Sequence, residues 1–107
     1  MEINKIKDFH KGWIVGNFSP SLFTTKEFEV GVKYFSQGEI EPAHFQLTAT
    51  EITMVISGVI SLGGQIFEPG DIITISPQEV ADFLSVTDSV LVCVKFPSHP
   101  NDKVVVE

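Results

Sequence analysis

Three polar side chains in the middle of the chain have the types and spacing of a ligand-binding site. His44 and Gln46 are two residues apart, and Glu51 follows after four intervening residues. Residues i and i+2 of a β-strand point to the same face, so His44 and Gln46 project together. Residues 48–50 are polar and short enough for a turn, and a hairpin through them would return Glu51 alongside. One imidazole, one amide and one carboxylate would then converge, which predicts a site for a metal ion or a polar ligand.

The segments around these residues show the period of β-strands. Residues 28–34 alternate between an apolar face (Phe28, Val30, Val32 and Tyr34) and a polar face (Glu29, Gly31 and Lys33). Further strands are predicted over residues 43–47, 51–62, 72–76, 82–86 and 89–96. No segment carries apolar residues at helical spacing over three turns. The pattern therefore predicts an all-β antiparallel sandwich or barrel with no helix longer than a single turn.

Glycine and proline mark the turns between these strands. Gly63 and Gly64 predict a two-residue hairpin turn, in which both positions need a positive φ. Pro69 and Gly70 suit the centre of a type II turn. Gly58 falls inside the run of residues 51–62, where it predicts a bulge or a tight bend.

Two stretches resemble the sequence motifs of the cupins. The first is marked by the spacing of Gly38, His44, Gln46, Glu51 and Gly58, with Gln46 where the family usually has a second histidine. The second is FEPGDIITISP over residues 67–77, with its Pro-Gly-Asp turn. The resemblance covers about residues 28–96. It implies a cupin double-stranded β-helix, an antiparallel jelly-roll barrel with an open mouth, within one domain of residues 1–107 that has flanking terminal strands.

The resemblance also implies a metal site of the three-histidine, one-glutamate kind, which holds iron, manganese, nickel or zinc. In this chain those positions fall on His44, Gln46, Glu51 and Ala81. An amide oxygen is a weak ligand for a transition metal, and Ala81 offers no donor. Asp82 could replace it only through a bulge, because neighbouring residues of a strand point to opposite faces.

Two interpretations of this site stay open. In one, His44, Gln46 and Glu51 hold a divalent metal ion, and water completes its coordination. In the other the site is vestigial, and the same side chains hydrogen-bond to one another inside the barrel.

The composition describes one acidic globular domain. The chain has 107 residues, 43% of them hydrophobic, and a net charge of −7. Its seven basic residues are all lysines and are dispersed along the sequence. Without arginine, nucleic-acid binding is not expected, and a strongly anionic ligand such as a nucleotide is disfavoured. No apolar run approaches about 18 residues, so no membrane span is expected. The N-terminal residues lack the apolar core of a signal peptide, so a cytoplasmic location is expected.

The termini suggest a partner. Residues 104–106 are three consecutive valines, which is strand material expected to pair with an edge strand of this chain or of a second copy. Trp13 is expected to be a core or interface anchor, and the chain contains nine phenylalanines. This is more apolar surface than one barrel hides, which predicts a homodimer with terminal strands at its interface.

These observations favour a small cupin that binds a small polar metabolite, for example a sugar-like one, in its barrel, with or without a divalent metal. An alternative is a metal-dependent cupin enzyme, such as an oxygenase, an isomerase or an epimerase. A third hypothesis is a non-enzymatic scaffold or dimerisation module with a vestigial site. The small number of strong metal ligands disfavours redox chemistry at this site, because two strong ligands hold iron less tightly than four.

Overall fold

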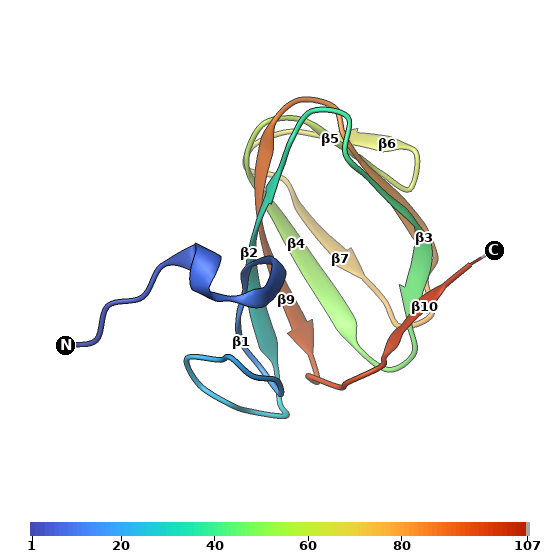
Figure 1. Ribbon diagram of the computed structural model, residues 1–107. Coiled ribbons are helices and arrows are strands. Elements are labelled where there is room, and N and C mark those ends of the chain that lie inside the picture. Colours follow the sequence, from blue (N-terminus) through green and yellow to red (C-terminus); the bar gives the residue numbers. More distant parts are fainter. Residues whose placement is uncertain (107) are drawn as a thin grey trace.

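The computed structural model describes residues 1–106, which form two antiparallel five-stranded sheets packed face to face (Figure 1). The first sheet has the order β1 (Trp13–Val15), β2 (Glu29–Phe35), β9 (Ser89–Phe96), β4 (Thr50–Ser57) and β7 (Ile72–Ile75). The second has the order β10 (Lys103–Val105), β3 (Ile40–Gln46), β8 (Ala81–Ser85), β5 (Ile60–Leu62) and β6 (Gln65–Phe67). The helical elements of the described residues are two 3₁₀ turns, η1 (Ile6–Asp8) and η2 (His10–Gly12). The predicted all-β jelly roll is therefore confirmed, and no described helix is long and apolar enough to cross a membrane.

The predicted turns lie where glycine and proline placed them. Gly63 and Gly64 have φ values of 58° and 80° and connect β5 to β6 in a two-residue hairpin. Gly70 has a φ of 94°, and the Asp71 amide donates to the Glu68 carbonyl at 3.0 Å. At Gly58 the chain leaves β4 in the first sheet and enters β5 in the second. The run of residues 51–62 is thus a bent pair of strands.

The space between the sheets is apolar at one end and polar at the other. Along β4 the inward side chains change from Glu51 through Thr53 to Val55. The paired positions on β9 are Lys95, Cys93 and Leu91. The apolar core consists of Val55, Ile60, Phe83, Leu91 and Cys93. The polar end is consequently free to form a pocket.

The first sheet turns its charged side chains inward, and the side chains on its outward face are mostly apolar. Lys33 of β2, Lys95 of β9 and Glu51 of β4 all line the pocket between the sheets. Because strand residues alternate, the intervening valines and isoleucines of these strands face away from the core. In an ordinary sandwich the outward face is the polar one. The polar face predicted for residues 28–34 is therefore the buried one here.

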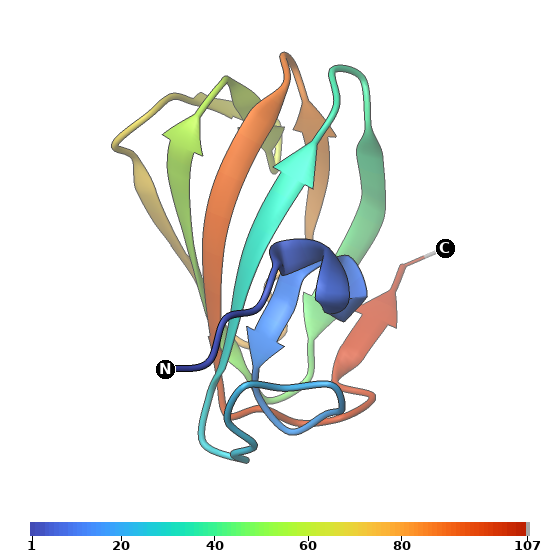
Figure 2. The same ribbon diagram turned by 60° about the vertical axis from the view of Figure 1, so that its left-hand side comes forward.

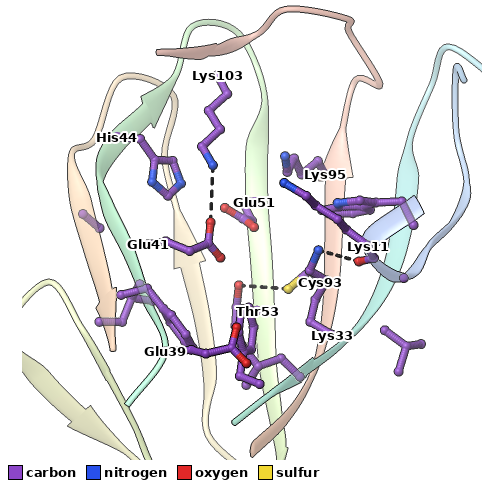
Figure 3. Close-up of a pocket in the computed structure, with 18 of the residues that line it drawn as sticks. Lys11, Lys33, Glu39, Glu41, His44, Glu51, Thr53, Cys93, Lys95 and Lys103 are labelled. Atoms are coloured by element: carbon purple, nitrogen blue, oxygen red, sulfur yellow. Dashed lines mark hydrogen bonds and ion pairs between the residues drawn. The ribbon is translucent and has the colours of Figure 1, made fainter. Parts of the chain in front are cut away.

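The hairpin predicted through residues 48–50 is wrong. β3 lies between β10 and β8, whereas β4 lies between β9 and β7, so residues 48–50 cross from one sheet to the other. Other strands occupy both edges of β3 and of β4, which leaves no edge for the two to pair. Glu51 therefore faces His44 across the space between the sheets (Figure 3).

The terminal segments complete the open end of the fold. The valine-rich tail pairs with its own chain, since Val104 and Val105 of β10 lie opposite Phe45 and His44 of β3. β1 pairs with β2, as Trp13 lies opposite Gly31. Figure 2 shows η1 and η2 in front of β1, beside the gap between the first sheet and β10. Both termini thus contribute to the rim of the pocket.

Candidate functional site

The polar end of the sandwich contains a pocket of about 840 Å³ that opens beside the N-terminal turns. Its walls come from both sheets, and residues 6–12 form part of its rim. The Lys33 ammonium donates to the Lys11 carbonyl at 2.6 Å, which ties this rim to β2 (Figure 3). The size falls within the range of ordinary small-molecule sites, about 300–1,000 Å³.

The structure places His44, Gln46 and Glu51 at this same pocket, together with Ala81. His44 and Ala81 are direct partners in the β3–β8 pairing. Asp82 is exposed, and Ala81 rather than Asp82 lines the pocket. The β3–β8 pairing shifts register at this point, but the extra residue lies on β3, so Asp82 stays outward and supplies no donor to the site.

A carboxylate that sequence analysis assigned no role also lines the pocket. The register of the β3–β8 pairing shifts between Glu41 and His44, so these two residues, three apart, both line it. The Glu41 carboxylate lies 3.3 Å from the Lys103 ammonium of β10. Strand alternation would have placed Glu41 and His44 on opposite faces, which is why the sequence carried no signal for Glu41.

The lysines gather at this pocket although they are scattered in the sequence. Five of the seven line it, namely Lys7, Lys11, Lys33, Lys95 and Lys103. Only four of the 13 acidic residues within residues 1–106 do so, namely Glu39, Glu41, Glu51 and Glu79. His10 lies on its rim and is exposed. The lysines thus gather at the pocket although the protein as a whole is acidic. This differs from the expectation that dispersed lysines disfavour an anionic ligand.

Two of these lysines lie against the indole ring of Trp13. The Lys33 and Lys95 ammonium groups are 5.0 Å and 4.7 Å from the ring centroid. The ring covers Gly31, where a Cβ atom would come within 2.7 Å of the ring carbon Cε3. Contacts of this kind stabilise a cation by about 0.5–2 kcal/mol, less than a paired carboxylate would in a dry site. Trp13 thus holds two cations side by side in the pocket.

Neither of these ammonium groups has a carboxylate partner among residues 1–106. The single ion pair within 4.0 Å in that part of the chain is the one between Lys103 and Glu41. Burial lowers the pKa of Lys33, an effect that Glu41 opposes. A buried cation without a counter-ion is unfavourable unless something else supplies negative charge.

Glu51 lies between the Glu41–Lys103 ion pair and Lys95. Figure 3 shows its carboxylate with Glu41 and Lys103 on one side and Lys95 on the other. Burial raises the pKa of Glu51, although Lys95 and then His44 oppose the rise. The His44 Nδ1 lies 2.9 Å from the Pro42 carbonyl. A carbonyl can only accept, so this contact places a proton on Nδ1 and leaves Nε2 available in the neutral ring.

Cys93 lies deeper in the same pocket and is suited to packing. Its sulfur is 3.7 Å from the Thr53 hydroxyl oxygen. Burial raises the pKa of the thiol to about 11, and the Glu51 carboxylate adds to the rise. A thiol with such a pKa is protonated at neutral pH and is a poor nucleophile.

The residues present fit a tightly held transition metal poorly. No three His, Cys, Asp or Glu side chains of residues 1–106 are grouped so that they could share an ion. His44 and Glu51 supply two strong donors, Gln46 supplies a neutral oxygen, and Ala81 supplies nothing. The ammonium groups of Lys95 and Lys103 also lie near Glu51 and oppose a further cation. The metal role of His44, Gln46 and Glu51 stays a prediction.

Comparisons with known proteins bear on the fold. No family model matches the chain, and no curated protein does. Among solved structures, a double-stranded β-helix protein of Klebsiella pneumoniae is 22% identical, with a TM-score of 0.69 over 78% of this chain and 73% of that one. An RmlC-like cupin of Shewanella frigidimarina is 16% identical, with a TM-score of 0.64 over 72% of each chain. Oxalate oxidase in complex with the substrate analogue glycolate is 21% identical, with a TM-score of 0.63 over 75% of this chain and 46% of that one.

Proposed function

We propose that the protein, which shares the cupin fold of those structures, binds a small polar metabolite in its barrel pocket. The metabolite carries a carboxylate. The observation that carries the proposal is the pair of lysines against Trp13. Lys33 and Lys95 are held within 5.0 Å of one indole ring and have no carboxylate within 4.0 Å among the described residues. A ligand carboxylate would supply the missing negative charge.

The rest of the pocket suits hydroxyl groups. Glu51 and the His44 Nε2 can accept hydrogen bonds, while Gln46 and Thr53 can both donate and accept. The exposed part of the Trp13 ring offers an apolar surface of the kind that receives the C–H face of a sugar. A hydroxy acid or a sugar acid combines these features. The related fold of oxalate oxidase was solved with glycolate, which is a small hydroxy acid.

Matched pairs of ligands test this proposal. We expect glucuronate and glycolate to bind in isothermal titration calorimetry, and glucose and ethylene glycol, which lack the carboxylate, to bind far more weakly. Lys95→Met should weaken binding of the acids by about 10- to 100-fold, because a charge-assisted hydrogen bond contributes roughly 1.5–3 kcal/mol. Lys26→Met is the control, since Lys26 is exposed and does not line the pocket.

Two results would contradict the proposal. One is equal binding of the acids and their neutral analogues. The other is the same loss of affinity in Lys26→Met as in Lys95→Met, which would indicate a general effect of net charge.

The predicted metal site is tested separately. We expect the wild-type protein to bind zinc or nickel weakly and Gln46→His to bind it more tightly, because the change adds a second imidazole beside His44. In the Gln46→His background, His44→Ala should remove most of the gain. Calorimetric titration with each metal measures both effects. If Gln46→His gave no gain over the wild type, the vestigial interpretation of the site would be the better one.

A further inference from the structure

Lys33 is an amine in a mostly apolar part of the pocket. In the β2–β9 pairing it lies opposite Leu91, which is 3% exposed. Two residues further along β2 is Phe35, which packs against the apolar core. Two residues before it is Gly31, which the Trp13 ring covers. The Lys33 side chain therefore leaves the sheet where the apolar core meets the polar end of the pocket.

A hydrogen bond holds the Lys33 nitrogen in place. It donates to the Lys11 carbonyl at 2.6 Å (Figure 3). The backbone next to that carbonyl is itself pressed against β2, because a Cβ atom at Gly12 would overlap the Val32 carbonyl oxygen. The carbonyl accepts one N–H bond and leaves the rest of the amine facing the pocket. An amine that is fixed at the wall of a pocket can meet a bound ligand in a defined geometry.

The surroundings of Lys33 favour loss of its proton. Burial is the main cause that lowers the pKa of Lys33, and the cations Lys95 and Lys11 add to the effect, whereas Glu41 and Cys93 oppose it. Each unit by which a pKa falls raises the fraction of neutral amine at a given pH about tenfold. A neutral amine is a nucleophile, and burial beside another cation is one way in which proteins activate lysine.

The other lysines of the pocket are less suited to act as a nucleophile. Lys103 is paired with Glu41 at 3.3 Å. The Glu51 carboxylate lies to one side of Lys95 (Figure 3), and the lysines of the rim are exposed. Lys33 has no carboxylate within 4.0 Å among residues 1–106. Loss of its proton also removes the repulsion between two cations at one indole ring.

We propose that Lys33 forms an imine with an oxo acid, a ligand that has an aldehyde or ketone as well as a carboxylate. The inference rests on the proposed function, because Lys95 holds the carboxylate while Lys33 attacks the carbonyl carbon. The two lysine nitrogens lie within 5.0 Å of the same ring centroid. A molecule only a few atoms long therefore reaches both.

The reaction is a condensation that needs no oxidant or reductant. The lone pair of the neutral Lys33 nitrogen forms a bond to the carbonyl carbon, and the π electrons of the C=O bond move to oxygen. The nitrogen then gives up its two protons, the oxygen leaves with them as water, and a carbon–nitrogen double bond remains. A further proton from solvent makes the imine a cation. This cation draws electrons from the neighbouring carbon atoms, so lysine imines activate carbonyl compounds.

Reductive trapping in the full-length protein tests the inference. Sodium cyanoborohydride reduces an imine to a stable secondary amine, and peptide mass spectrometry locates it. With pyruvate we expect labelling of Lys33 to be at least about tenfold faster than labelling of Lys26, which is exposed and outside the pocket. With acetone, which lacks the carboxylate, this preference for Lys33 should be about tenfold smaller. Because both lysines are in one sample, the difference in reactivity between the two ketones cancels.

The comparison of Lys33 with Lys26 needs no variant, so it does not depend on whether a variant folds. Unfolding in guanidinium chloride should abolish the preference, because the pocket is then lost. Lys33→Arg keeps a cation and a donor for the Lys11 carbonyl but supplies no amine. It should lower the total labelling by pyruvate to the level of the exposed lysines.

Three results would overturn the inference. They are equal labelling of Lys33 and Lys26 in the folded protein, a dominant adduct on another lysine, and a preference for Lys33 that survives unfolding. Binding of glycolate in calorimetry without preferred labelling of Lys33 would contradict the imine and leave the proposed function intact. An equal preference for Lys33 with pyruvate and with acetone would support the imine and contradict the carboxylate site.

Discussion

Replacing Asp102 by alanine is expected to lower the free energy of unfolding by about 3 kcal/mol, because several hydrogen bonds to one buried carboxylate would be lost together. Asp102 is 5% exposed. Its oxygens accept from the Thr48 amide at 3.0 Å, the Thr48 hydroxyl at 2.7 Å and the Ala49 amide at 3.0 Å. These are the residues with which the chain crosses from β3 to β4. The substitution therefore loosens the connection that brings Glu51 opposite His44.

The effect of this substitution should depend on pH. Burial alone would raise the pKa of Asp102, but the hydrogen bonds from Thr48 and Ala49 outweigh it and hold the pKa below its usual value. A carboxylate with a lowered pKa in the folded state stabilises the fold above its unfolded pKa of about 3.9, and it loses that contribution as the pH falls through the folded value. The stability difference between wild type and Asp102→Ala should thus be full at pH 7 and shrink progressively in acid.

Denaturant unfolding at pH 7 and at several acidic values measures both effects. Asp82→Ala is the control, because Asp82 is exposed and its side chain makes no hydrogen bond within the described residues. A difference between wild type and Asp102→Ala that stayed constant down to low pH would show that the carboxylate charge is not what stabilises the crossing.

Gly58→Ala is expected to be at least as damaging, with a loss of about 3 kcal/mol or more, because it combines backbone strain with a clash. Gly58 has a φ of 80° where β4 ends and the chain passes to the second sheet. A Cβ atom there would overlap the Asp88 carbonyl oxygen and come within 2.8 Å of the Ser89 Cα. Both obstacles are backbone atoms, so no side chain can rotate away to relieve the clash.

Gly64 is a matched control for this substitution. It also has a φ of 80°, but an added Cβ atom would have no neighbour within 4 Å. Gly64→Ala should therefore report the strain of a positive φ alone, about 1 kcal/mol. Thermal and denaturant unfolding of the two variants separate the strain from the clash. Equal losses in the two variants would mean that the corner at Gly58 relaxes and that its close approach to Asp88 is not a constraint.

The sequence by itself determined the elements of the fold, because the signals for strands and turns are local. Strict alternation indicated β2, and Gly63-Gly64 placed the β5–β6 hairpin, where both glycines have a positive φ. The resemblance of the two motifs to those of the cupins implied the barrel, and His44, Gln46 and Glu51 do line one pocket. The strand and the hairpin turn depend on residues that are close in the sequence, so backbone geometry alone could indicate them. Glu51 reaches the pocket by a crossing between the sheets and not by the predicted hairpin.

The tertiary structure alone decided which partners each strand has and which face it buries. Residues 48–50 have the composition of a hairpin turn, yet β3 and β4 belong to different sheets, because β10, β8, β9 and β7 occupy their edges. Alternation separates the two faces of β2 but does not say which is inward, and here the face with Lys33 lines the pocket. Lys33 and Lys95 meet at Trp13 only because β1, β2 and β9 are neighbours in the first sheet. Such contacts join segments far apart in the chain, and their choice depends on the free energy of the whole packed molecule and not on any local pattern.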